Sequence, residues 1–168
     1  LLSFGTGDKQ RPEETLYTPI QKSIKDGGFV RVVLLPSKIT EQSANEVKAR
    51  NEGIHIDIHP LPETGQENNA DACFEHFNSI ISSLIAEGIG PQYLVVDFTR
   101  GTKAMSAALV LAAVRHEIPR LRYMTGDRDQ LGNVISGTEE IHGISPVIAT
   151  GQRQLDFARS FFRELCAF

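Results

Sequence analysis

The sequence has few cysteines and no long apolar run, and each of these features counts against one class of protein. Its two cysteines, Cys73 and Cys166, form no CxxC pair, which favours a reducing compartment over a disulfide-rich secreted fold. The longest uninterrupted apolar run, residues 107–114, has eight residues, far short of the roughly 20 that a membrane-spanning helix needs. We therefore expect no membrane-spanning segment among these residues.

The chain also lacks a surplus of positive charge. Its 17 Lys and Arg are outnumbered by 21 Asp and Glu, which gives a net charge of −4 at pH 7. Broad binding of duplex nucleic acid usually draws on a large basic surface, so duplex nucleic acid is not an expected partner. A small basic pocket remains compatible with this balance. The length of 168 residues suits a single domain over 1–168 that folds without a disulfide or metal.

Familiar catalytic and nucleotide-binding motifs are missing. Neither Gly5 nor Gly101 has the spacing of a Walker loop, and Gln10 stands where a dinucleotide fingerprint starting at Gly5 needs its third glycine. There is no GxSxG elbow for a nucleophilic serine. These absences count against ATP hydrolysis and NAD-dependent hydride transfer.

Metal and nucleophile sites are not indicated either. His55 and His59 share one face of a predicted strand, but no Cys or carboxylate pattern completes a metal site beside them. Cys73 lies on a predicted helix without a Cys-His arrangement, so a buried structural thiol is expected. Glu139 and Glu140 are neighbours on a predicted strand and point to opposite faces. We predict no metal, no cofactor and no catalytic residue.

Strand-like apolar runs alternate with amphipathic helical stretches. Strands are expected at 1–4, 29–35, 54–59, 93–96, 120–125 and 133–141, and helices at 12–25, 40–51, 68–87, 102–116 and 152–165. This alternation predicts an α/β, Rossmann-like fold: a mainly parallel sheet of about six strands with helices on both faces. In such sheets ligands bind beyond the carboxyl ends of the strands, where the strand order reverses.

Four loops follow predicted strands at that edge: 5–9, 36–38, 99–103 and 126–128. They carry the cations Lys9, Lys38, Arg100, Lys103 and Arg128, against Asp8 and Asp127. An acidic chain that gathers its cations on one edge of a sheet is expected to bind an anion there.

Residues 97–106 are the most informative stretch. Asp97 ends a strand, Gly101 permits a tight turn and a helix starts near Thr102, so free amides and the positive end of the helix dipole face outward. Arg100 and Lys103 add charge, and the hydroxyls of Thr99, Thr102 and Ser106 add hydrogen bonds. The alternative is that Thr102 only caps the helix and the cations are solvated.

This segment, D-x-T-x-G-T-K-x-M-S, is part of a resemblance that covers nearly the whole chain. Together with Ser3 to Gly7, Leu34 to Ser37, Tyr123 to Arg128 and Gly132 to Val134, it resembles the CRISPR-associated Rossmann-fold (CARF) sensor domain. Where many members of that family have two glycines, this chain has Arg100 and Gly101. This departure is expected to keep the essential turn and to alter the ligand contacts.

The resemblance implies a homodimer that binds cyclic oligoadenylates, the second messengers of type III CRISPR defence, with cyclic tetra-adenylate the favoured ligand. The ligand-binding residues that it implies are Gly5, Thr6, Gly7, Asp8, Ser37, Thr99, Arg100, Gly101, Thr102, Lys103, Met105, Gly126 and Arg128. Arg100, Lys103 and the nearby amides would meet phosphate, and the glycines near residue 5 would let the backbone approach the ring closely. A two-fold symmetric ring suits two identical sites across a dimer interface.

The predicted helix from Thr102 is apolar nearly all round, so it must be buried on more than its sheet-facing side. A second subunit is one cover, and a neighbouring helix of the same chain is the other. Family members couple the sensor to an effector, and we expect none within residues 1–168: it would lie outside this segment or be supplied by another protein. We expect that element before Leu1, with a cytoplasmic location and a membrane tether only if the preceding segment is a transmembrane helix.

Three functions remain open at this point. The leading one is a sensor, not an enzyme, that binds the ring, changes the dimer and releases the ring intact. The second is a ring nuclease that cleaves the same ligand without metal by attack of a ribose 2′-hydroxyl. The third is an unrelated nucleotide-binding Rossmann domain.

Overall fold

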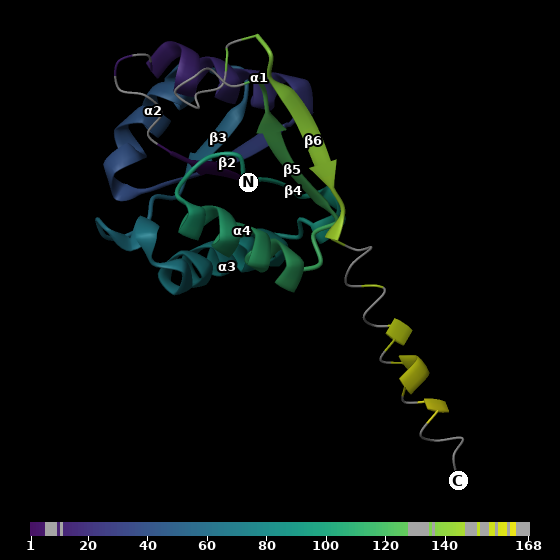
Figure 1. The fold of residues 1–168 in the computed structure, drawn as a ribbon. Coiled ribbons are helices and arrows are strands. Elements are labelled where there is room, and N and C mark those ends of the chain that lie inside the picture. The colour runs from purple at the N-terminus through teal and green to yellow at the C-terminus, as the bar shows by residue number, and fades with distance from the viewer. Residues whose placement is uncertain are drawn as a thin grey trace.

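The computed structural model of the chain contains one six-stranded sheet in the order β3-β2-β1-β4-β5-β6 (Figure 1). The strands are β1 (Leu2–Phe4), β2 (Arg31–Pro36), β3 (His55–Ile58), β4 (Val95–Asp97), β5 (Arg120–Thr125) and β6 (Glu140–Ile144). The first five are parallel and β6 is antiparallel to β5. The structure describes residues 1–5, 10, 12–127, 135, 137–146, 151, 155, 156, 158–160, 162 and 163. The predicted α/β, Rossmann-like fold is confirmed.

Helices cover both faces of the sheet (Figure 1). They are η1 (Glu13–Tyr17), α1 (Thr18–Gly27), η2 (Lys38–Thr40), α2 (Glu41–Ala49), η3 (Gln66–Asn68), α3 (Ala70–Ala86), η4 (Pro91–Tyr93) and α4 (Lys103–Arg115). Helices α1 and α2 lie on one face, and α3 and α4 lie on the other. No helix among the described residues is long and apolar enough to cross a bilayer.

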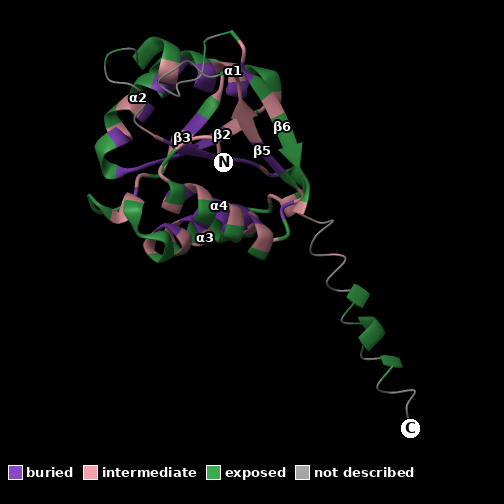
Figure 2. Ribbon diagram, viewed as in Figure 1, coloured by how far each residue is buried: buried purple, intermediate pink, exposed green. Residues whose placement is uncertain are grey.

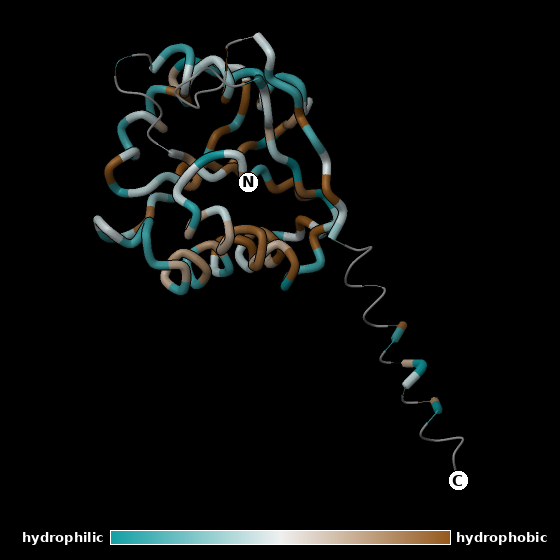
Figure 3. The backbone as a smooth tube through the Cα atoms, viewed as in Figure 1, coloured by the Kyte–Doolittle hydropathy of each residue, from teal (hydrophilic) through white to brown (hydrophobic). Residues whose placement is uncertain are grey.

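The core divides into two layers because strand side chains alternate between faces. In β2, Val32 and Leu34 pack with α1 and α2, whereas Val33 and Leu35 pack with α3 and α4. Continuous apolar strands of this kind are expected where both faces of a parallel sheet are covered. Figure 2 shows the central strands buried, and Figure 3 shows apolar residues along those strands and along α4.

The sixth strand lies later in the chain than predicted. It starts at Glu140 instead of near residue 133, because a turn closed by a 3.2 Å hydrogen bond from the Thr138 amide to the Ile135 carbonyl precedes it. Asn133 and its neighbour Val134 lie outside the described residues.

The predicted helix over 152–165 is described only in part. Its described residues, 155, 156, 158–160, 162 and 163, are helical and exposed. Leu155 is 55% exposed and Phe162 is 65% exposed, so these two apolar side chains do not pack into the core. The other apolar positions expected on this helix, Phe157, Phe161 and Leu165, lie outside the described residues.

Candidate ligand-binding site

The order of the strands fixes where a ligand is expected. The chain leaves β1 toward the α1 face and leaves β4 toward the α4 face, so the order reverses between these two neighbours. In open α/β sheets such a reversal opens a crevice beyond the carboxyl ends of the strands. A cavity of about 210 Å³ lies there. Its lining residues are Phe4, Gly5, Ser37, Ile39, Thr40, Glu67, Asn68, Gly101, Thr102 and Met105.

Two glycines let the loops after β1 and β4 approach each other in this crevice. A Cβ atom on Gly5 would lie 2.8 Å from the backbone nitrogen of Gly101, which is closer than real Cβ contacts allow. Gly101 has φ 101°, and a Cβ atom there would lie 3.2 Å from the Cβ of Met105. The turn predicted at Gly101 is thus present, and only glycine fits at both positions.

The amino end of α4 forms one wall of the crevice. Thr102 caps the helix: its Oγ1 accepts a 3.2 Å hydrogen bond from the Met105 amide and donates to the Glu67 carbonyl. Lys103 is exposed, and neither its ammonium nor the amides of Lys103 and Ala104 have a partner among the described residues. First-turn amides and a nearby cation together favour an anion at this point.

Polar and apolar groups alternate around the rest of the crevice. The Ser37 hydroxyl is buried, 3.1 Å from the Thr40 hydroxyl. Ile39 is 60% exposed at the rim, and Met105 is fully buried beneath Gly101. Such a mixed lining suits a ligand with both an apolar ring and polar edges.

Sequence reasoning missed Glu67 and Asn68, which η3 brings to the crevice. One carboxylate oxygen of Glu67 accepts a 2.8 Å hydrogen bond from the Gly65 amide. The sequence does contain a signal for this loop, because the loop after β3 also follows a strand at this edge of the sheet. The loop after β3 was not predicted to bind a ligand, since it contains neither a cation nor a glycine-rich turn at its start.

Thr99 and Arg100 do not line the crevice. The Thr99 hydroxyl donates to the Asp97 carboxylate and accepts a 2.8 Å hydrogen bond from the Met124 amide, so it joins β4 to β5. The Arg100 guanidinium donates to the Thr15 carbonyl. Loss of hydration lowers the pKa of Arg100, and the negative charges of Asp97 and Glu139 oppose that shift.

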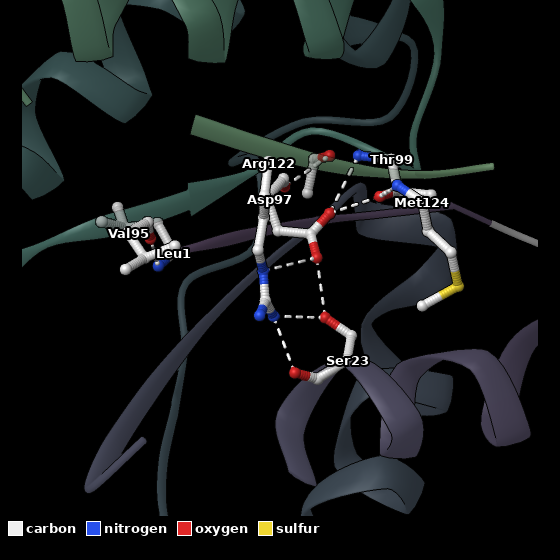
Figure 4. A network of polar contacts seen from close by, with 8 residues as sticks. Leu1, Ser23, Val95, Asp97, Thr99, Arg122 and Met124 are labelled. Carbon is white, nitrogen blue, oxygen red and sulfur yellow. Dashed lines mark hydrogen bonds and ion pairs between the residues drawn. The ribbon is translucent and has the colours of Figure 1, made fainter. Parts of the chain in front are cut away.

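A buried polar network beside these residues anchors the end of β4 (Figure 4). One oxygen of Asp97 accepts a 2.7 Å hydrogen bond from the Ser23 hydroxyl and lies 3.2 Å from Nε of Arg122. Arg122 also donates a 2.7 Å hydrogen bond to the Ser23 carbonyl. The network ties α1 to β4 and β5 directly below the loop that carries Thr99.

Gly126 and Asp127, the described residues directly after β5, are not among the residues that line the cavity. The Asp127 amide donates a 2.9 Å hydrogen bond to the Thr138 hydroxyl, and its carbonyl accepts one of 2.8 Å from the Ile135 amide. These bonds tie the segment that follows Gly126 to the residues before β6. The predicted site residues Thr6, Gly7, Asp8 and Arg128 lie outside the described residues.

The structure therefore gathers part of the predicted site. The predicted residues that line the crevice are Gly5, Ser37, Gly101, Thr102 and Met105. Lys103 is the first residue of α4, directly after Thr102.

The described residues also show whether a reactive thiol or a metal site is present. Cys73 is buried as predicted, and burial raises its pKa to about 11, so the thiol stays protonated at neutral pH. No three His, Cys, Asp or Glu side chains of the described part gather in a way that could hold a metal ion.

A larger cavity, of about 290 Å³, lies at the opposite, amino end of the strands. It is lined mostly by apolar side chains, among them Ile24, Phe29, Val33 and Leu84. Its polar side chains include Asp97 and Arg122, which bind each other. The smaller crevice at the switch point is the stronger candidate for an anionic ligand, because it combines helix amides, hydroxyls and Lys103.

No protein-family model matches the chain, and no curated protein is similar to it in sequence. Solved structures do resemble it. Protein VC1899 from Vibrio cholerae overlaps with a TM-score of 0.55 at 13% identity, over 74% of this chain and 30% of that protein. A type III CRISPR defence DNA nuclease activated by cyclic oligoadenylate overlaps with a TM-score of 0.52 at 18% identity. The alignment covers 76% of this chain and 18% of that protein. The chain shares the fold of these two proteins.

A third solved structure, Can2 from Sulfobacillus thermosulfidooxidans in complex with cyclic tetra-adenylate, aligns over 76% of this chain and 32% of its own. Its TM-score is 0.46 at 15% identity, too low to establish a common fold. This chain spans less than a third of the length of each of the three proteins.

Proposed function

We propose that this chain is a CARF-type sensor domain that binds a cyclic oligoadenylate, with cyclic tetra-adenylate the favoured ring. One observation carries the proposal: Gly101, Thr102 and Met105 of the D-x-T-x-G-T-K-x-M-S segment line the switch-point crevice, and the Gly101 backbone closely approaches Gly5. Lys103 directly follows the helix cap Thr102. The fold shared with a nuclease activated by cyclic oligoadenylate supports it.

The crevice offers a separate place for each part of such a ligand. A phosphate group is expected at the amino end of α4, next to Lys103 and the first-turn amides, since both favour negative charge. The base then lies toward Ser37, Ile39 and Asn68, where apolar surface and hydrogen-bonding groups meet. The close approach of Gly5 to Gly101 leaves no side chain between the two loops at this point.

The surface of α4 supports a dimer as part of this function. Helix α3 covers one side of α4, where the His116 ring lies 2.9 Å from the Asn78 side chain. Leu111 nevertheless stays 59% exposed. It shares a helix face with the exposed residues Ala107 and Lys103 at a spacing of four residues. A second copy packed on this face would bring two crevices to one interface, as a two-fold symmetric ring requires.

Glu67 favours a second candidate function, the ring nuclease. It supplies a carboxylate at the crevice that can act as the general base. In that reaction the base takes the proton of a ribose 2′-hydroxyl, and the oxygen attacks the adjacent phosphorus. The 5′-oxygen leaves and takes a proton from solvent, which produces a 2′,3′-cyclic phosphate end.

Chromatography of labelled cyclic tetra-adenylate incubated with the protein separates these functions. Intact, bound ring supports the sensor. Linear products that disappear in Glu67→Gln, while binding persists, support the nuclease. Absence of binding to rings of three, four and six adenylates refutes both functions.

A further inference from the structure

Arg100 has a second role that its place in the motif does not suggest. It belongs to the loop that borders the crevice, yet its side chain crosses to the α1 face of the sheet. There its guanidinium donates to the Thr15 carbonyl. The backbone carbonyl of Arg100 accepts a hydrogen bond from the Ser3 hydroxyl of β1. Around it is a space of only about 10 Å³, lined with Pro19, Ile20 and others. This space is close to the least that holds one water molecule.

Thr15 lies in an unusual element. It is part of η1, a single π-helical turn in which the Thr18 amide bonds to the Glu13 carbonyl, five residues back. Such turns are rare and are frequent at functional sites. The connection that leads to η1 starts at Gly5, and Gly5 lines the crevice. The Arg100 guanidinium therefore joins η1, which follows Gly5 in the chain, to the loop after β4.

The charges around Arg100 hold it in this position. Asp97 and Glu139 stabilise the guanidinium electrostatically while burial opposes its charge. Within the described part of the chain, Oε1 of Glu139 is buried without a hydrogen-bond partner. The Lys22 ammonium lies 3.9 Å from Oε2 of Glu139 and donates a 2.6 Å hydrogen bond to the Glu139 carbonyl. A neutral side chain at position 100 would leave the buried carboxylates of Asp97 and Glu139 with less compensating positive charge.

We propose that Arg100 is a positioning residue of the cyclic oligoadenylate site: it holds η1 against the loop after β4 and does not contact the ligand. The inference rests on the proposed function for the identity of the ligand. This role gives a structural reason for Arg100, which stands where many CARF domains have the first glycine of a pair. It also replaces the phosphate contact expected for Arg100 from the sequence.

Hydrogen exchange of the free protein tests the positioning contact. In Arg100→Gln, the amides of residues 13–18 are expected to exchange at least about tenfold faster, since a hydrogen bond to a charged group is lost. Arg100→Lys should be intermediate, because one donor and the charge remain. Arg120→Gln is the matched control: it removes an exposed 3.1 Å bond from an arginine to the Gln92 carbonyl, far from η1. Unchanged exchange in Arg100→Gln overturns the proposal.

Salt dependence of cyclic tetra-adenylate binding distinguishes positioning from direct contact. Losing a phosphate contact lowers the slope of log affinity against log salt by about one unit. Lys103→Ala should show that reduction. Arg100→Gln should lose about tenfold in affinity with the wild-type slope, and a reduced slope would mean that Arg100 touches phosphate and the proposal is wrong. If the wild type binds no ring, the proposed function fails, while the exchange result still decides the role of Arg100.

Discussion

Gly5 and Gly101 meet where β1 and β4 end: Gly5 has no room for a side chain, and Gly101 has a positive φ that side chains rarely adopt. The Cβ of an alanine at position 5 would lie 2.8 Å from the Gly101 nitrogen. That neighbour is backbone, so it cannot rotate away as a side chain would. The contact makes the switch-point crevice dependent on two residues that are 96 positions apart in the sequence.

Gly5→Ala is therefore expected to disturb the crevice directly. Forcing a methyl group into packed backbone costs about 1–3 kcal/mol of stability, and the displaced loop should also weaken ring binding. Urea unfolding and binding titration measure the two effects. Gly53→Ala is the control, since its added Cβ meets nothing within 4 Å and its φ is not positive. Equal stability and affinity for Gly5→Ala and wild type would contradict the close approach.

Lys103→Ala tests the phosphate position. Because Lys103 is exposed and binds no described residue, its loss should leave stability unchanged. Affinity for cyclic tetra-adenylate should fall by about 1–3 kcal/mol, the range for a lost charge-assisted hydrogen bond. Lys48→Ala removes another exposed lysine, from α2, and should bind normally. Wild-type affinity in Lys103→Ala removes this residue from the site.

The Thr102 hydroxyl is expected to serve both helix and site. Thr102→Ala removes the cap of α4 and should cost about 1 kcal/mol of stability. It also frees the Glu67 carbonyl from its contact, so η3 should shift and ring affinity should fall. Thr102→Ser keeps the hydroxyl and should restore both quantities in unfolding and titration experiments. If serine and alanine behave alike, the hydroxyl is not the group responsible.

Local signals predicted the architecture well because each acts within a few residues. The run at 29–35 is β-branched and apolar and forms β2, and the turn at Gly101 follows from the change of strand to helix. The direction of the Arg100 side chain was not predictable. An arginine in a loop can reach either face of a sheet, and here the choice depends on the distant groups Thr15 and Glu139.

The late start of β6 has a similar cause. The sequence predicts a strand from residue 133, but antiparallel pairing with β5 fixes the register of β6 through Tyr123 opposite His142. These two rings lie 5.5 Å apart between centroids and stack. A cross-strand pair of this kind is invisible in the sequence, since the partner strand and its direction are set by the whole sheet.

Removing Asp97 alone should lower the stability of the domain more than replacing Asp97 and Arg122 together. Asp97→Ala leaves the Arg122 guanidinium buried beside Ser23 without its carboxylate, and should destabilise the domain by about 3–5 kcal/mol. The double variant Asp97→Leu with Arg122→Met removes both charges and should recover much of that loss in urea unfolding. A double variant no more stable than Asp97→Ala would show that the network contributes mainly through hydrogen bonds to Ser23 and Thr99.

The exposed face of α4 gives the test of the dimer. Leu111 is 59% exposed in the single chain, so Leu111→Asp should leave the fold intact while placing like charges opposite each other across a two-fold interface. Sedimentation equilibrium is expected to give a dimer for the wild type and a monomer for Leu111→Asp. Val30→Asp, at a position 90% exposed just before β2, should remain dimeric. A monomeric wild type, or a dimeric Leu111→Asp, would exclude this face as the interface, and the two crevices would then not be joined through α4.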